Sequence, residues 1–333
     1  MILSPAVLAL LGCSAMVGAV AALAAAAGLS VVIGWNPDDS GPRQLARERR
    51  SFLVEAGITL VFGCQLASLF LFVATAERLH SLFTGAMCAA GTLNANPFGY
   101  PTLLVKSVVF LLCGVWLVVN RASPAAASTG LVRFKHLFLV LVAGGLLAEN
   151  LLQYRYFAGL DPEVITSCCA TIFAAGAGGV GAGLAALPPL PCQIAFLAGL
   201  SLTMAAGLRA LRPGSSPAAF ALLTVPLGAL SVAALISWIA PAFYQLPTHH
   251  CPFCLLSPKS GFVGYPLYGS LSLAVVAGGS SGLVHRLRSI DPFHCIRPAE
   301  ERRLCVTSMV CFACFSLIAL WPVLATGWRA GGH

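Results

Sequence analysis

Residues 101–120 read PTLLVKSVVFLLCGVWLVVN, an apolar run that a single charged residue, Lys106, interrupts. About 20 such residues in a helix cross the roughly 30 Å hydrocarbon core of a bilayer. Lipid offers no hydrogen-bond partner to the backbone, so a spanning segment of this kind has to form its own bonds as an α-helix. The run therefore predicts a transmembrane helix.

The rest of the chain repeats this pattern. Of its 333 residues, 58% are hydrophobic and 9% are charged, whereas a soluble domain has about 25% charged residues. The sequence predicts an all-α, polytopic integral membrane helix bundle, a single transmembrane domain over residues 1–333 with the lipid bilayer as its main partner. The expected spans lie near 5–33, 52–75, 101–120, 136–158, 189–211, 217–243, 266–288 and 305–327.

One further stretch is ambiguous. Residues 170–188 are apolar enough to suggest a ninth crossing, but they are rich in glycine and run into the pair Pro188 and Pro189. Glycine and proline favour turns over regular helix. We therefore expect a re-entrant or surface segment here, and eight spans in all.

The basic residues predict the orientation. Of 19 Lys and Arg residues, 14 lie in the alternate connections 34–51, 121–135, 209–216 and 286–304. Basic loops stay on the cytoplasmic side of a membrane, so both termini are expected on the extracytoplasmic side of the inner membrane. The net charge of +8 is then an orientation signal. Its spread over four short loops, without a binding motif, argues against nucleic acid as a partner.

Three loops are then predicted to face outward, at 76–100, 159–188 and 244–265. They hold most of the sulfur and imidazole groups that lie outside the spans. The candidate metal ligands are His80, Cys88, Cys168, Cys169, His249, His250, Cys251 and Cys254.

The densest group is PTHHCPFC at 247–254. A C-x-x-C spacing lets two thiolates converge on one metal ion, and it also lets two thiols form a reversible disulfide. A complete zinc motif has a second ligand pair at a set distance, and none follows here. The remaining ligands would have to come from the other outer loops. A structural disulfide is the simpler alternative, since the outer compartment is oxidising.

Polar residues inside the spans are the second set of candidates, because charge at mid-membrane costs at least about 2.5 kcal/mol. Glu149 and Gln153 share one helical face at i, i+4. Lys106 lies about one and a half turns inside its span. A Lys106–Glu149 pair and snorkelling of Lys106 to the headgroups are both open alternatives.

Three motifs, GAMCAAGTLNAN, TSCCA and PTHHCPFC, resemble those of an uncharacterised family of bacterial multi-pass membrane proteins. That resemblance implies no settled activity. The C-x-x-C with a second cysteine pair is similar to vitamin K epoxide reductases and disulfide-forming membrane oxidoreductases, which work beside a quinone. The present chain departs from them in having about eight spans instead of a four-helix core. The adjacent cysteines Cys168 and Cys169 resemble, locally, those of mercury-transport membrane proteins.

Three functions fit these residues. The first is an outer Cys/His site that binds a soft transition metal, Cu or Zn, for transport or for delivery to a periplasmic carrier protein or transporter subunit. The second is a membrane thiol–disulfide oxidoreductase, in which Cys251 attacks, Cys254 resolves and a quinone or a thiol carrier takes the electrons. The third is a non-catalytic subunit stapled by disulfides that docks a partner. The sequence leaves open whether the chain is an enzyme.

Overall fold

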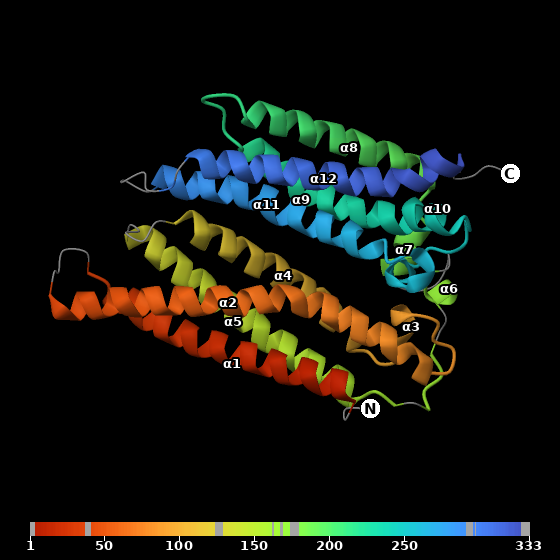
Figure 1. Ribbon diagram of the computed structural model, residues 1–333, viewed down its shortest axis with the longest axis horizontal. Coiled ribbons are helices and arrows are strands. Elements are labelled where there is room, and N and C mark those ends of the chain that lie inside the picture. Colours follow the sequence, from red (N-terminus) through yellow and green to blue (C-terminus); the bar gives the residue numbers. More distant parts are fainter. Residues whose placement is uncertain are drawn as a thin grey trace. The chain divides into compact units, whose positions relative to one another are not determined.

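The computed structural model describes residues 4–36, 41–123, 129–161, 163–166, 169–173, 180–290, 296 and 298–327. Its ordered elements in these ranges are helical (Figure 1). The long helices are α1 (Pro5–Gly34), α2 (Pro42–Leu79), α4 (Gly99–Ala122), α5 (Thr129–Ala158), α8 (Pro189–Ala210), α9 (Ala218–Ala234), α11 (Gly264–Ile290) and α12 (Pro298–Thr326). The short ones are η1 (His80–Leu82), α3 (Ala89–Leu93), α6 (Cys169–Ile172), α7 (Val180–Ala185), the π-helical turn η2 (Leu235–Ile239), α10 (Ala240–Tyr244), η3 (Phe253–Leu256) and η4 (Pro258–Ser260).

The expectation of a multi-pass helical membrane protein is confirmed. Within the described ranges, eight helical segments are long and apolar enough to cross a membrane. Each corresponds to one predicted span, and the sixth runs without interruption through α9, η2 and α10. Hydropathy locates these segments because a helix that crosses the hydrocarbon core must be apolar over about 20 residues.

Three helices begin earlier than their predicted spans, at Pro42, Thr129 and Pro298. Their first turns carry arginines and other polar residues, such as the Arg49–Arg50 pair. A helix can continue into water once it has crossed the hydrocarbon, since its backbone bonds are internal. Hydropathy therefore finds the spanning part and misses these polar extensions.

The stretch 170–188 contains α6 and α7, separated by residues 174–179, which lie outside the described ranges. With four and six residues, neither helix has the length of a crossing. That this stretch is a re-entrant or surface segment stays a prediction.

The chain forms two compact units. Unit 1 comprises residues 1–75, 95–162 and 284–300, and unit 2 comprises residues 76–94, 163–283 and 301–333. The prediction of one transmembrane domain stays a prediction, and each unit is described by itself.

In unit 1, small residues of α1 pack closely against α5. A Cβ added at Gly18 would lie 2.1 Å from Asn150 Nδ2, and one at Gly28 would lie 2.7 Å from His136 Nδ1. Ala21 and Ala25 lie between them, also buried. Small residues at this spacing let two membrane helices approach, since lipid supplies little hydrophobic drive for helix association. Helices α2 and α4 complete the core with Phe62 and other apolar side chains.

In unit 2, α8, α9, α11 and α12 surround an aromatic core. Phe196 packs against Trp238 and Phe315, with ring centroids 6.2 and 6.0 Å apart. Buried hydroxyls bond to their own or a neighbouring backbone, as when Ser308 Oγ donates to Ala274 O at 2.8 Å. Such bonds satisfy hydroxyl groups at membrane depth.

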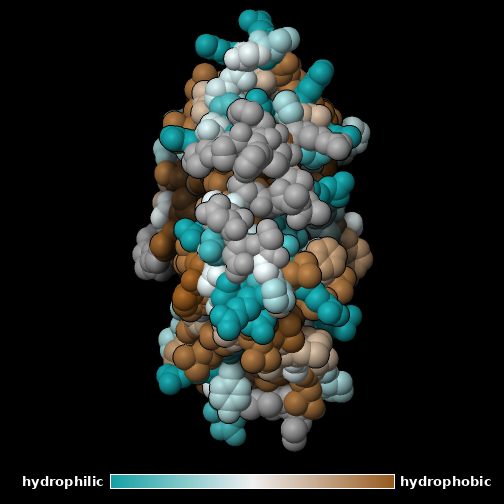
Figure 2. Space-filling view, turned by 90° about the vertical axis from the view of Figure 1, so that its left-hand side faces the viewer, coloured by the Kyte–Doolittle hydropathy of each residue, from teal (hydrophilic) through white to brown (hydrophobic). Residues whose placement is uncertain are grey.

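Figure 2 includes the ends at which α2 and α5 of unit 1 begin, and it shows hydrophilic side chains interspersed with hydrophobic ones.

Candidate thiol centre

Three cysteine sulfurs converge in unit 2. The Sγ atoms of Cys88, Cys251 and Cys254 all lie within 4.8 Å of one another, and those of Cys88 and Cys251 are 3.5 Å apart. Cys88 precedes α3, whereas the other two belong to the C-x-x-C motif more than 160 residues later. The fold therefore adds a third thiol to the pair that the motif supplies.

The centre is enclosed by apolar side chains. Cys88 and Cys251 are each 1% exposed, and Cys254 is partly buried. Ala90, Phe173, Ala185 and Ile236 form one buried cluster with them. Such an environment excludes most water from the sulfurs while Cys254 remains reachable.

Two contacts place Cys88. The backbone N–H of Ala89 donates to Glu77 Oε2 at 2.6 Å, which ties the start of α3 to the end of α2. Gly85 has φ of +90°, and a Cβ there would lie 2.3 Å from Thr166 O. Only glycine adopts this conformation at low cost. The Thr166 N–H also donates to Thr84 O at 3.0 Å, so the loop at 76–100 packs on the loop at 159–188.

The C-x-x-C turn is held through its backbone carbonyls. Tyr244 donates its hydroxyl to Cys251 O at 3.1 Å, and Tyr268 donates to Pro252 O at 2.6 Å. Ser257 and Ser260 both donate to Cys254 O, at 2.8 and 2.9 Å. These side chains fix the backbone that carries the two cysteines, as residues hydrogen-bonded to metal ligands commonly do.

His250 is bound to the backbone of the π-helical turn. In η2 the Ala240 N–H bonds to Leu235 O, so the next carbonyl, that of Ile236, would need a donor from Pro241. Proline has no N–H. Instead, His250 Nδ1 lies 2.8 Å from Ile236 O. A carbonyl only accepts, so Nδ1 carries the proton and Nε2 is left with its lone pair in the neutral ring.

Replacing His250 by alanine is expected to destabilise unit 2 by about 1–3 kcal/mol, because a buried carbonyl would lose its donor. The matched control is His249→Ala. The His249 ring packs edge-on against Tyr244 at 4.5 Å between centroids, a contact worth about 0.5–1.5 kcal/mol. Thermal unfolding in detergent measures both. A His250 variant as stable as its His249 counterpart contradicts this role.

The other predicted ligands are placed as follows. Among the described residues, the group of three metal-ligating side chains contains thiols and no imidazole. His80 Nδ1 contacts Glu77 O instead. Cys168 lies outside the described residues, and of Cys169 only the backbone, at the start of α6, is described. Helix α3 contacts both α6 and η3, so the loops at 76–100, 159–188 and 244–265 meet.

In unit 1 the structure decides between the two alternatives for Lys106. Lys106 Nζ and Glu149 Oε1 form an ion pair in which both side chains are fully buried. Snorkelling of Lys106 is therefore not observed. Gln153 is also fully buried and donates to Ser14 Oγ at 3.1 Å.

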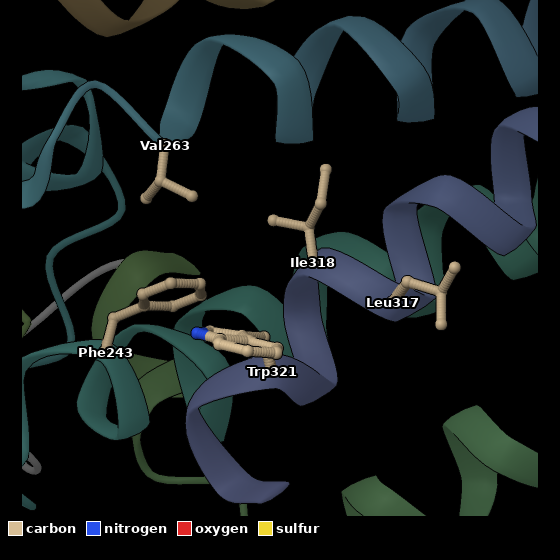
Figure 3. Close-up of a pocket in the computed structure, with 5 residues that line it drawn as sticks. All are labelled: Phe243, Val263, Leu317, Ile318 and Trp321. Atoms are coloured by element: carbon tan, nitrogen blue, oxygen red, sulfur yellow. The ribbon is translucent and has the colours of Figure 1, made fainter. Parts of the chain in front are cut away.

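An apolar pocket of about 350 Å³ also lies in unit 2. Figure 3 shows Phe243, Val263 and Trp321 around it, with Leu317 and Ile318 from α12. Phe243 and Val263 belong to the two segments that flank the C-x-x-C turn in sequence. The pocket could accept part of a lipid or another apolar molecule.

Sequence reasoning missed the residues that support the centre. Tyr244, Tyr268, Ser257 and Glu77 were not candidates, since tyrosine and serine are common near membrane surfaces. Their only sequence signal is proximity to the cysteine motifs. Comparison with protein families, with curated proteins and with solved structures gives no match for this chain.

Proposed function

We propose that this membrane protein binds a soft transition metal ion on the thiolates of Cys88, Cys251 and Cys254, for transport or for delivery. The observation that supports it is the convergence of three sulfurs from distant segments within 4.8 Å. An ion with metal–sulfur bonds of about 2.3 Å in tetrahedral geometry separates its sulfur ligands by about 3.8 Å. The spacing of the thiols is thus close to that of a loaded site.

The ligand set favours Cu(I) over Zn(II). Thiolates select soft ions such as Cu(I), which accepts three sulfur ligands. A structural Zn(II) takes four ligands, and the described residues supply three. A fourth ligand from Cys168, Cys169 or a carrier protein would make the site suitable for Zn(II). The enclosure of Cys88 and Cys251 protects a bound soft ion from water.

The charge pattern supports a location for this site. With 14 of 19 basic residues in alternate connections, the thiol centre belongs on the extracytoplasmic side of the inner membrane, where both termini also lie. There it could receive or pass an ion to a periplasmic metal carrier or to a transporter subunit. If such a transporter subunit supplies the energy to move the ion across the membrane, this chain needs no nucleotide-binding site of its own.

One observation favours a second function, thiol–disulfide exchange. The sulfurs of Cys88 and Cys251 are 3.5 Å apart, so little movement would join them. Formation of that disulfide removes two electrons and two protons from the thiols. A quinone could take both and become a quinol. The apolar pocket between Phe243 and Trp321 offers a place for an isoprenoid chain.

Metal analysis of the purified, reduced protein tests the first function. We expect one equivalent of Cu(I) to survive competition with a chromophoric Cu(I) chelator, and Cys251→Ser/Cys254→Ser to abolish it. The chain offers a matched control in α12, where Cys311 and Cys314 have the same spacing. Cys311→Ser/Cys314→Ser should retain the full equivalent. A metal-free wild type in which two of the three cysteines cycle between thiols and a disulfide would reject metal binding and favour exchange.

Tyr268→Phe should lower Cu(I) affinity about 10-fold, at the low end of the effect of losing an outer-shell partner of a metal ligand. Its hydroxyl holds Pro252 O, between the two cysteines of the turn. The control is Tyr265→Phe on the same helix, whose ring packs on Phe262 and should bind Cu(I) as the wild type does. Equal affinities for the two variants in chelator competition would show that the hydroxyl plays no part.

A further inference from the structure

A second concentration of buried chemistry lies in unit 1, around Glu149. Its carboxylate accepts from Lys106 and also from Gln65 Nε2, at 2.8 Å to Oε1 and 2.7 Å to Oε2. Lys106 Nζ donates in addition to Ser68 Oγ at 2.8 Å. Glu149 and Lys106 are fully buried, and Gln65 is 2% exposed. Four side chains from three helices thus converge at membrane depth.

One buried acceptor of this cluster, and two more on the turns of α5 that carry and follow Glu149, lack a donor. Within the described structure, the buried oxygens Gln65 Oε1, Asn150 Oδ1 and Gln153 Oε1 have no hydrogen-bond partner. A buried polar atom without a partner costs about 1–3 kcal/mol. A structural ion pair would be more stable without these excess acceptors. These unpaired oxygens suit a site that takes up an additional proton, because a newly protonated group could donate a hydrogen bond to one of them.

A second polar site lies on the same face of α2. Glu55 pairs with Lys135 at 2.7 Å, and Ser51 Oγ lies 3.2 Å from Glu55 Oε1 and 2.9 Å from His136 Nε2. His136 is 1% exposed. This site is nearer the ends of the helices that carry the basic loops.

Packed apolar side chains lie between the two sites along α2. Ile58 and Phe62 of α2 are fully buried, and Phe62 packs edge-on against Trp116 at 5.2 Å. From Glu55 to Gln65 the helix rises about 15 Å. Unit 1 therefore holds two titratable sites in line along α2, with the buried apolar side chains of Ile58 and Phe62 between them on that face.

We propose that Glu149 is a proton-binding site within the membrane, with Lys106 as its counter-ion. In the step, the carboxylate takes one proton and becomes a carboxylic acid. Lys106 keeps its own charge and its bond to Ser68, so the charge of the cluster rises by one. Among residues facing Glu149, α4 contributes the titratable groups Lys106 and Cys113, and α2 contributes the neutral Gln65. Ionisable groups at membrane depth commonly serve proton relays.

This proposal rests on unit 1 alone and is independent of the thiol centre. The test is infrared difference spectroscopy of the full-length protein in liposomes, comparing high and low pH. We expect a carboxylic acid C=O band from a buried group that is present in the wild type and in Glu55→Gln and is missing in Glu149→Gln. Identical difference spectra for wild type and Glu149→Gln, over the pH range in which both are folded, overturn the proposal.

A second variant covers the case in which Glu149→Gln does not fold. Glu149→Asp keeps the carboxyl group but shortens the side chain, which changes its hydrogen bonds to Gln65 and Lys106. We expect the band to shift in frequency in this variant. A band that keeps its frequency and amplitude belongs to another carboxyl group, and that result also overturns the proposal.

Discussion

Cys88→Ser is expected to lower Cu(I) affinity by at least about 100-fold, although both cysteines of the C-x-x-C motif remain. Loss of an outer-shell partner alone costs about 10–100-fold, and Cys88 is a direct ligand in the proposed site. Its sulfur lies 3.5 Å from that of Cys251. Removal would leave two thiolates and a hydroxyl, which is a poor ligand for a soft ion.

The control for this variant is Cys113→Ser, since Cys113 is also buried but lies in unit 1. Chelator competition should give it the wild-type affinity. If Cys88→Ser binds Cu(I) as tightly as the wild type, the site is made by the C-x-x-C motif without the loop at 76–100.

Lys106→Met is expected to destabilise the protein by about 3–5 kcal/mol, because it leaves the Glu149 carboxylate buried without its counter-charge. Replacing both partners, in Lys106→Met/Glu149→Leu, should recover most of that loss. A buried pair replaced by apolar residues of similar volume is often neutral or stabilising. The double variant is thus predicted to be more stable than the single one.

Unfolding in a graded mixture of mild and denaturing detergents measures both variants. Lys135→Met is a useful comparison, since Lys135 pairs with Glu55, which is 18% exposed, and water can compensate that carboxylate. Lys135→Met should therefore destabilise the protein less than Lys106→Met does. Equal losses for Lys106→Met and the double variant would contradict the account of the pair, because the cost would then come from packing.

The sequence predicted the spans because lipid imposes one dominant requirement, apolar length. It could not locate the first turns of α2, α5 and α12, which lie beyond that requirement. The π-helical turn η2 was not foreseen either. It depends on Pro241 and on the donor that His250 supplies, a partnership between segments that hydropathy does not register.

The thiol centre was predictable in part. Spacing alone brought Cys251 and Cys254 together, and the charge pattern put Cys88 in a loop on the same side. That Cys88 completes the group depends on Gly85 and Glu77, whose contacts exist only in the folded chain. The imidazoles of His249 and His250 stay predicted ligands. The bond of His250 Nδ1 to a backbone carbonyl, which leaves Nε2 with its lone pair, depends on the folded chain and not on the motif. The Lys106–Glu149 pair needed Gln65 and Ser68 of α2, which no local pattern reveals.

X-ray absorption spectroscopy at the copper edge of the Cu(I)-loaded protein tests the central claim most directly. The account predicts a first shell of three sulfur atoms without an imidazole nitrogen, lost in Cys251→Ser/Cys254→Ser and retained in Cys311→Ser/Cys314→Ser. A shell dominated by nitrogen, or a wild-type protein that retains no copper after chelator treatment, would contradict it.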